Sequence, residues 1–109
     1  MGLSKSEEFS VRDNKVARYA KALGHPARIA ILRLLAKKAS CYCGDIVEEL
    51  PLSQSTVSQH LKELKESGLI QGDIEGKSVC YCIDEKAWAE AKEIMDALFA
   101  IYTSKSKCC

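Results

Sequence analysis

The stretch SCYCGDIVEELPLSQSTVSQHLKELKES, residues 40–67, decides the fold that we predict for this chain. Pro51 lacks a backbone N–H and disfavours helical geometry in the residue before it, so a helix that starts near Cys43 should stop there. Ser53 can cap a second helix by accepting a free N–H of its first turn. Gly68 offers the left-handed conformation that commonly ends a helix. The stretch therefore predicts a short helix, a tight turn and a second helix.

The second helix, over about residues 53–67, has two different faces. Val57, Leu61 and Leu64 share one stripe at helical spacing and should face a core. Short hydroxyls, amides and a lysine elsewhere on the helix can pair with base edges or phosphates in a major groove. The alternative is an ordinary amphipathic helix whose polar face is solvated. For His60, which lies close to the apolar stripe, the alternative is a histidine packed within the protein. The candidate DNA contacts are Gln54, Ser55, Thr56, Ser58, Gln59, His60 and Lys62.

Residues 69–83 alternate like a two-stranded hairpin with a tip at Glu75-Gly76-Lys77, and Lys77 is a further candidate DNA contact. A helix-turn-helix followed by a hairpin predicts a mainly α fold with a two-stranded β-hairpin wing, the winged helix-turn-helix. Cys80 and Cys82 share one face of the second strand. We expect the other face to meet the core, which leaves these thiols outward or partly covered and outside the candidate metal site.

The rest of the chain predicts helices on both sides of this unit. A helix over about residues 11–23 ends before His25, which we interpret as a cap or loop residue, and Pro26 starts the next helix. Asp84 can cap a last helix that runs to about Tyr102. Its apolar residues have the near-heptad spacing of helices that pack on another helix. They are Trp88, Ala91, Met95, Leu98 and Tyr102.

Three segments together resemble the winged-helix repressors of the arsenic-repressor (ArsR/SmtB) family. They are AKALGHPARIAILRLL (21–35), SQSTVSQHLKELKESGLI (53–70) and EGKSVCYCI (75–83). The resemblance implies a homodimeric repressor that binds double-stranded operator DNA and leaves it when a metal or metalloid binds. It also implies that the last helix, about residues 84–102, is a dimerisation helix.

Composition agrees with one small domain. The 109 residues carry a net charge of +1, which identifies no partner by itself. We expect a domain over residues 11–103 between a flexible N-terminus (1–10) and a flexible, cysteine-containing tail (104–109). The sequence has no apolar segment of membrane-spanning length and no signal core, so we expect a cytoplasmic protein with no membrane partner. In that compartment its six cysteines are more often ligands or free thiols than structural disulfides.

Cys41 and Cys43 are the first candidate metal ligands. Thiolates select thiophilic ions, and the start of a helix favours the thiolate form. Arsenic-responsive members of the family carry a Cys-x-Cys at this helix, often with a third cysteine downstream, whereas this chain has isoleucine and valine there. Cys108 and Cys109 are the candidates for the missing ligand, on a tail that spans roughly 20 Å when extended. We expect As(III) or Sb(III) as the inducer.

Several alternatives remain. A zinc sensor of this family needs histidines on the last helix, and residues 84–102 contain none; a cadmium or lead sensor adds N-terminal cysteines, and residues 1–40 contain none. A redox or persulfide switch would use Cys41 in a disulfide. A thiol oxidoreductase or an arsenic-carrying protein without DNA is less consistent with these motifs. The chain shows no nucleophile–base pattern, so we expect no enzymatic activity.

Overall fold

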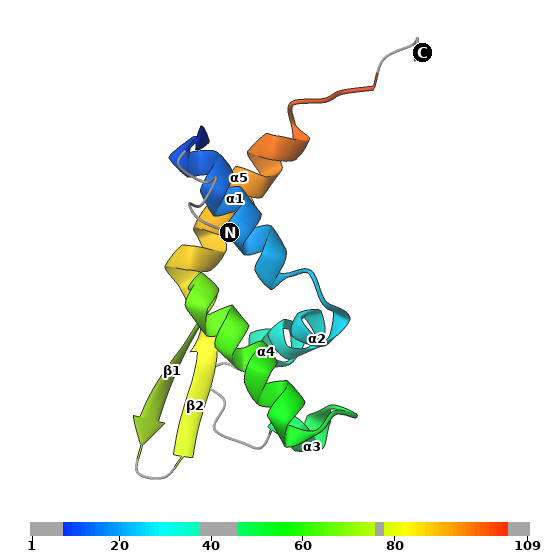
Figure 1. Ribbon diagram of the computed structural model, residues 1–109, viewed down its shortest axis with the longest axis vertical. Helices are drawn as coiled ribbons and strands as arrows, with labels where there is room; N and C mark the ends of the chain where they lie inside the picture. The colour runs from blue at the N-terminus through cyan, green and yellow to red at the C-terminus, as the bar shows by residue number, and fades with distance from the viewer. Residues whose placement is uncertain (1–7, 38–45, 76–77, 105–109) are drawn as a thin grey trace.

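In the computed structural model, the described residues are 8–37, 46–75 and 78–104. They form five helices and one hairpin in the order α1 (Val11–Ala22), α2 (Pro26–Ala36), α3 (Ile46–Glu49), α4 (Gln54–Ser67), β1 (Ile70–Glu75), β2 (Ser78–Ile83) and α5 (Glu85–Phe99). Figure 1 shows α4 crossing the middle of the molecule, with the hairpin beside it and α1 lying along α5 at the opposite end. This is the mainly α architecture with a hairpin wing that the sequence predicts.

Side-chain caps fix where the helices begin. Ser53 accepts a hydrogen bond from the Thr56 N–H at 3.3 Å, and Asp84 accepts one from Ala87 at 3.0 Å. The Nδ1 of His25 accepts the Ala27 N–H at 3.0 Å, so His25 is the cap of α2 as we interpreted it. These side chains satisfy N–H groups that have no partner within their helix.

Two helix ends differ in how well the sequence predicts them. Gly68 ends α4 with a φ of 91°, a left-handed conformation that glycine adopts without a Cβ clash. By contrast, α5 ends at Phe99 with Ala100 as its cap, three residues before the expected end at Tyr102. No residue there enforces a stop, and the apolar spacing by itself does not set where a helix frays.

The core lies where α2, α4 and the hairpin meet, and α1, α3 and α5 pack around it. The predicted stripe of α4 supplies Val57, Leu61 and Leu64, which are 2%, 8% and 0% exposed. Ile31 of α2 and Ile70 of β1 are also fully enclosed. Burial of this stripe fixes the rotation of α4 about its axis and therefore which residues it presents to solvent.

The hairpin is a regular antiparallel pair in which Ile70 lies opposite Ile83 and Glu75 opposite Ser78. Gly72 lies opposite Tyr81, whose ring covers it so closely that a Cβ at Gly72 would come within 2.8 Å of a ring carbon. Tyr81 and Ile83 of β2 also pack on the core cluster, so this strand holds the wing to the core.

Candidate nucleic-acid interface and thiol site

The solvent face of α4 carries most of the residues expected to contact DNA. Gln54, Ser55, Ser58, Gln59 and Lys62 are exposed on it, and we call these five residues the reading face. The side of α4 that carries Val57 and Leu64 is buried, so the reading face is turned toward solvent. Lys77, the candidate at the wing tip, lies outside the described residues.

Thr56 and His60 are only partly exposed, and both already have partners in the protein. The Ser53 hydroxyl donates to Thr56 Oγ1 at 2.9 Å as part of the helix cap. The His60 ring packs on the ring of His25, with centroids 4.4 Å apart. Burial, followed by the nearby His25 and Arg28, lowers the pKa of His60 below its usual value. These contacts favour the packed interpretation of His60, and a DNA contact by either residue stays a prediction.

Arg28 of α2 contacts two other helices, α1 and α4. Its Nη1 donates to the carbonyl oxygen of Lys21 in α1 at 3.3 Å and lies 3.9 Å from a carboxylate oxygen of Glu63 in α4. Its Nε is buried and has no hydrogen-bond partner among the described residues. Arg28 thus ties the start of α2 to both α1 and α4.

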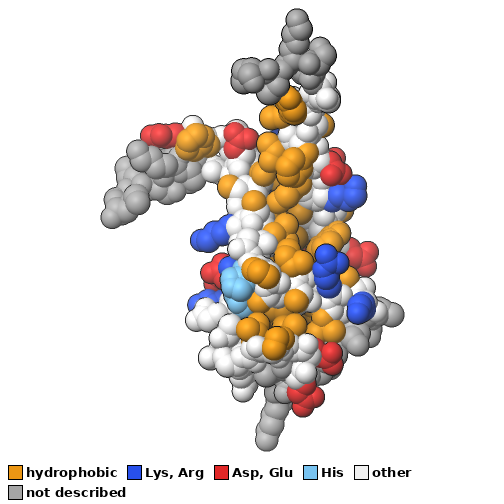
Figure 2. All heavy atoms as spheres, turned by 90° about the vertical axis from the view of Figure 1, so that its right-hand side faces the viewer, with side chains coloured by type: hydrophobic (Ala, Val, Ile, Leu, Met, Phe, Trp, Pro, Cys, Tyr) orange, Lys and Arg blue, Asp and Glu red, His pale blue; other side chains and the backbone are white. Residues whose placement is uncertain are grey.

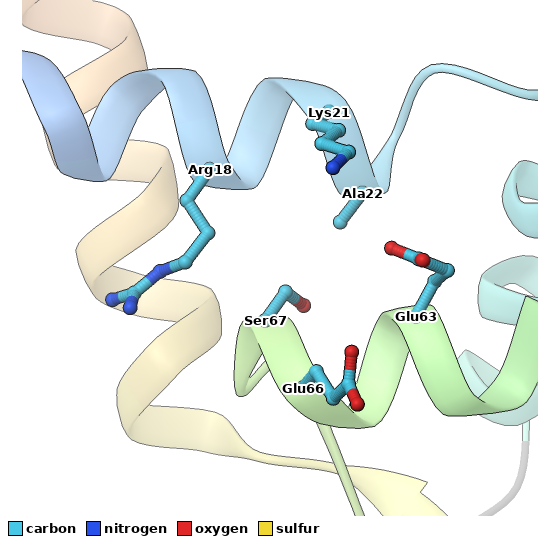
Figure 3. Close-up of a pocket in the computed structure, with 6 residues that line it drawn as sticks. All are labelled: Arg18, Lys21, Ala22, Glu63, Glu66 and Ser67. Carbon is cyan, nitrogen blue, oxygen red and sulfur yellow. The ribbon is translucent and has the colours of Figure 1, made fainter. Parts of the chain in front are cut away.

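A polar cavity of about 190 Å³ separates α1 from the C-terminal half of α4 (Figure 3). Its wall carries two cations and two carboxylates, so its formal charge is balanced. Ser67 at its base is buried and engaged, donating to the Leu64 carbonyl at 2.6 Å and accepting from the Leu69 N–H at 3.2 Å. The lining residues are Arg18, Lys21, Ala22, Glu63, Glu66 and Ser67.

A second polar link joins α1 to α5. Tyr19 donates a 2.6 Å hydrogen bond to Glu90, and the Lys15 ammonium lies 2.8 Å from the other oxygen of that carboxylate. Burial, together with the bond to Glu90, raises the pKa of Tyr19 to about 12. The bonds from Lys15 and Tyr19 lower the pKa of Glu90. Lys15 is therefore engaged within the protein.

The four cysteines expected to bind metal, Cys41, Cys43, Cys108 and Cys109, lie outside the described residues. Within the described part of the chain, no group of three or more histidine, cysteine or acidic side chains is arranged to hold a metal ion. The described part does include Ile46, the first residue of α3, which is buried in the core. The start of α3 is thus anchored in the core.

The two described cysteines correct one expectation. We expected both thiols to be outward or partly covered: Cys82 is partly buried, as expected, but Cys80 is only 4% exposed, so the expectation is wrong for Cys80. Both cysteines are disulfide-bonded. Strand alternation does put Tyr81 and Ile83 on the core side, but it does not show what covers the opposite face.

An exposed apolar surface lies along α5. Figure 2 shows hydrophobic side chains gathered in a band along one face of the molecule. An apolar cavity of about 340 Å³ opens beside α5 and is lined mainly by hydrophobic side chains. Its lining is Leu23, Leu69, Trp88, Ala91, Lys92 and Met95. Further large apolar side chains are exposed at the end of α5 and just beyond it, at Leu98, Phe99, Ile101 and Tyr102.

No helix in the described part of the chain is both long and apolar enough to cross a membrane.

Comparison with known proteins places this geometry in context. Residues 25–71 match the family described as "Bacterial regulatory protein, arsR family". The biofilm growth-associated repressor of Xylella fastidiosa is 30% identical over 101 residues, which are 93% of this chain and 85% of the repressor. The chain is also similar to the solved cadmium metal-sensor CmtR of Mycobacterium tuberculosis, at 30% identity and a TM-score of 0.54 over 86% of this chain and 95% of that one. HlyU of Vibrio cholerae matches at 29% identity and a TM-score of 0.64, over 86% and 98% of the two chains.

Proposed function

This chain belongs to the arsR family of bacterial regulatory proteins, and we propose that it is a homodimeric repressor that releases its operator when cysteine thiolates capture As(III) or Sb(III). The family and its relatives are DNA-binding transcriptional regulators and not enzymes, and this chain shares that activity.

The reading face is the proposed DNA contact. Its hydroxyl and amide groups suit base edges, and Lys62 suits a phosphate. The start of α4, which Ser53 caps, is the end that would enter the groove. The N–H groups of that first turn that the cap does not engage would then also point toward the DNA. Thr56, His60 and the wing-tip Lys77 complete the proposed set of contacts.

A homodimer is proposed from the exposed apolar surface of α5. Phe99 and Ile101 are 73% and 80% exposed, and Leu98 and Tyr102 adjoin them. A contiguous exposed apolar surface beside an apolar cavity more often binds a partner than stays in contact with water. A second copy of this chain is the fitting occupant, because two-fold symmetry would also place two reading faces on successive turns of the duplex.

The thiol site rests on one observation, that α3 packs directly against α4. Cys43 precedes the first described residue of α3 by only three positions. An ion bound by Cys41 and Cys43 would pull on α3, and the displacement would reach α4 through that contact and disturb its fit to the groove. As(III) favours three thiolates, and Cys108 and Cys109 are the proposed sources of the third.

The test is release of a fluorescent fragment of the chain's own upstream DNA, followed by anisotropy under a phosphine reductant. We expect arsenite to release the unmodified protein. The C41S/C43S variant should bind DNA normally and fail to respond, whereas the matched C108S/C109S control should lose only part of its response. A full response from C41S/C43S would contradict the assignment of the thiol site.

A thiol redox switch is a second candidate, favoured by the disulfide-bonded state of Cys80 and Cys82. A peroxide would oxidise two thiols to one disulfide and be reduced to water, and the new bond would move the wing or α3. Release by peroxide alone, reversed by the phosphine, would support this switch. Release by arsenite while the phosphine is present would support ligand binding, since no disulfide persists under that reductant.

A further inference from the structure

The two histidines of the chain meet where the start of α2 lies against α4. His25 is the cap of α2, His60 lies within α4, and their ring centroids are 4.4 Å apart. We call these two residues the imidazole pair. Histidine is the side chain whose ordinary pKa makes it gain charge between about pH 5 and 8. The interface between α2 and α4 therefore contains two groups that can become cations in mild acid.

A second proton on His25 has only one place to go. A neutral imidazole carries its proton on one ring nitrogen and accepts a hydrogen bond with the other. Nδ1 of His25 accepts the Ala27 N–H at 3.0 Å, so the proton of the neutral ring lies on Nε2. The second proton must then go to Nδ1, which can no longer accept that N–H. Charging His25 therefore removes the side-chain cap of α2.

A proton on His60 would lie near a cation that the interface already holds. The side chain of Arg28 is only 14% exposed, and its Nε is buried without a hydrogen-bond partner in the described part of the chain. Glu63 is the one described carboxylate whose charge favours a proton on His60, and its oxygen lies 3.9 Å from Arg28 Nη1. A single carboxylate cannot balance Arg28 and two charged imidazoles.

The other elements packed against α4 offer no compensation. They are α1, α3 and β1, and no charged group described on them shifts the pKa of His60. Burial and the charges of His25 and Arg28 together lower that pKa. Like charges that are held together in a partly buried interface favour its opening.

Protons can reach the pair, and α4 connects it to the DNA contact. His25 is exposed and His60 is partly exposed, and Figure 2 shows histidine atoms at the molecular surface. Gln59 and Lys62 of the reading face lie one and two positions from His60 on the same helix. A change in how α4 rests on α2 therefore also moves the reading face.

We propose that the imidazole pair is a proton-sensitive contact, and that its protonation loosens α4 from α2 and weakens operator binding in mild acid. Protonation transfers no electron and needs no metal, so this control is independent of the thiol inducer. It rests on the part of the proposed function that assigns DNA contact to the reading face. By linkage, operator binding would in turn lower the affinity of the pair for protons.

The sign of the pH effect distinguishes this contact from a direct role of His60 on DNA. A charged His60 that touched a phosphate would bind the operator more tightly as the pH falls, because it adds a cation to the DNA contact. A charged His60 within the imidazole pair would weaken binding, because it disturbs the seat of α4. The two roles of one residue thus predict opposite slopes of operator affinity against pH.

The experiment measures operator affinity of the full-length protein by anisotropy, under a phosphine reductant and without arsenite. We expect affinity to fall at least about fivefold between about pH 7.5 and about pH 5.5. The ratio of the two affinities should approach one in H60Q. It should be smaller than in the unmodified protein in H25N, whose amide oxygen keeps a cap for α2. E93Q, a change of an exposed carboxylate on α5, is the control and should keep the full loss.

A second readout needs no DNA. The chain has two histidines, so a proton NMR titration gives two sets of imidazole signals, which H60Q assigns. The backbone amides of α4 should shift with the same midpoint as the His60 ring. Operator affinity that is constant or rises in acid, an equal loss in H60Q, or α4 amides that do not follow the His60 ring would overturn the proposal. Failure of the proposed reading face is separate, because it would appear at neutral pH as full operator affinity in a variant with Gln59 and Lys62 replaced.

Discussion

The imidazole rings of His25 and His60 pack against each other, with centroids 4.4 Å apart and planes tilted by 51°. His25 caps α2 and His60 lies within α4, so the pair connects the start of α2 to α4. The groups that face His60 are His25, the cap of α2, Arg28 within α2, and Glu63 on its own helix. A proton on His60 would therefore enter a partly buried place that already holds a cation.

The first prediction concerns the pH dependence of stability. The folded pKa of His60 is lowered, so as the pH falls the unfolded chain takes up this proton before the folded protein does. Its contribution to stability is therefore complete above the ordinary histidine pKa of about 6.5 and is lost as the pH falls below that value. Denaturant unfolding of His60→Gln should show a weaker loss between neutral and mildly acidic pH than the unmodified protein. Lys62→Gln, the control on the same helix, should keep the full loss.

The second prediction concerns the α1–α5 link. Tyr19 has a folded pKa of about 12, so its neutral form stabilises the fold fully below the unfolded value of 10.0. That contribution is lost as the pH rises from there through about 12. Tyr19→Phe removes both the titrating group and the bond to Glu90, and its stability should change less over this range. Unfolding curves, with phenolate absorbance to follow ionisation, provide the measurement; equal alkaline losses in both proteins would contradict the assignment.

The third prediction tests how α4 is anchored. Leu64 is 0% exposed, so Leu64→Ala should cost about 2–5 kcal/mol of unfolding free energy. Gln59→Ala, on the exposed side of the same helix, should leave stability within about 0.5 kcal/mol. Chemical denaturation of both variants gives the comparison. A small effect at Leu64 would mean that the stripe does not hold the helix.

The fourth prediction separates phosphate contacts from base contacts. Lys62→Gln should weaken operator binding and lower the slope of log affinity against log salt by about one. Gln59→Ala should cost about 1–3 kcal/mol on the operator, with less effect on unrelated DNA. Lys86→Gln, exposed at the start of α5, is the control for net charge and should keep both the affinity and the slope.

The fifth prediction concerns assembly. Phe99 is 73% exposed in one chain, so Phe99→Glu should leave the fold of the subunit intact while it places a charge in the proposed dimer surface. Sedimentation should show a dimer for the unmodified protein and a monomer for the variant, with weaker operator binding. Glu93→Gln, on an exposed part of the same helix, should remain dimeric. A dimer that persists in Phe99→Glu would place the interface elsewhere.

Local spacing in the sequence predicts the helices and the wing. Ser53 and Asp84 each accept the N–H group three residues further along the chain, and Pro26 fixes only its own backbone, so their effect does not depend on the rest of the fold. The stripe from Val57 to Leu64 is likewise a property of one helix. These local rules also explain the orientation of the reading face, because burial of one side exposes the other.

What only the tertiary structure decides are the contacts between residues far apart in the chain. The bond from Tyr19 to Glu90 joins positions 71 residues apart, and the pairing of His25 with His60 joins two helices whose crossing no local pattern specifies. The burial of Cys80 belongs to the same class. Alternation along β2 fixes which side chains share a face, but what covers that face depends on how the hairpin packs on the rest of the chain. Spacing determines direction within an element, and only packing between elements determines the neighbours that give a side chain its chemistry.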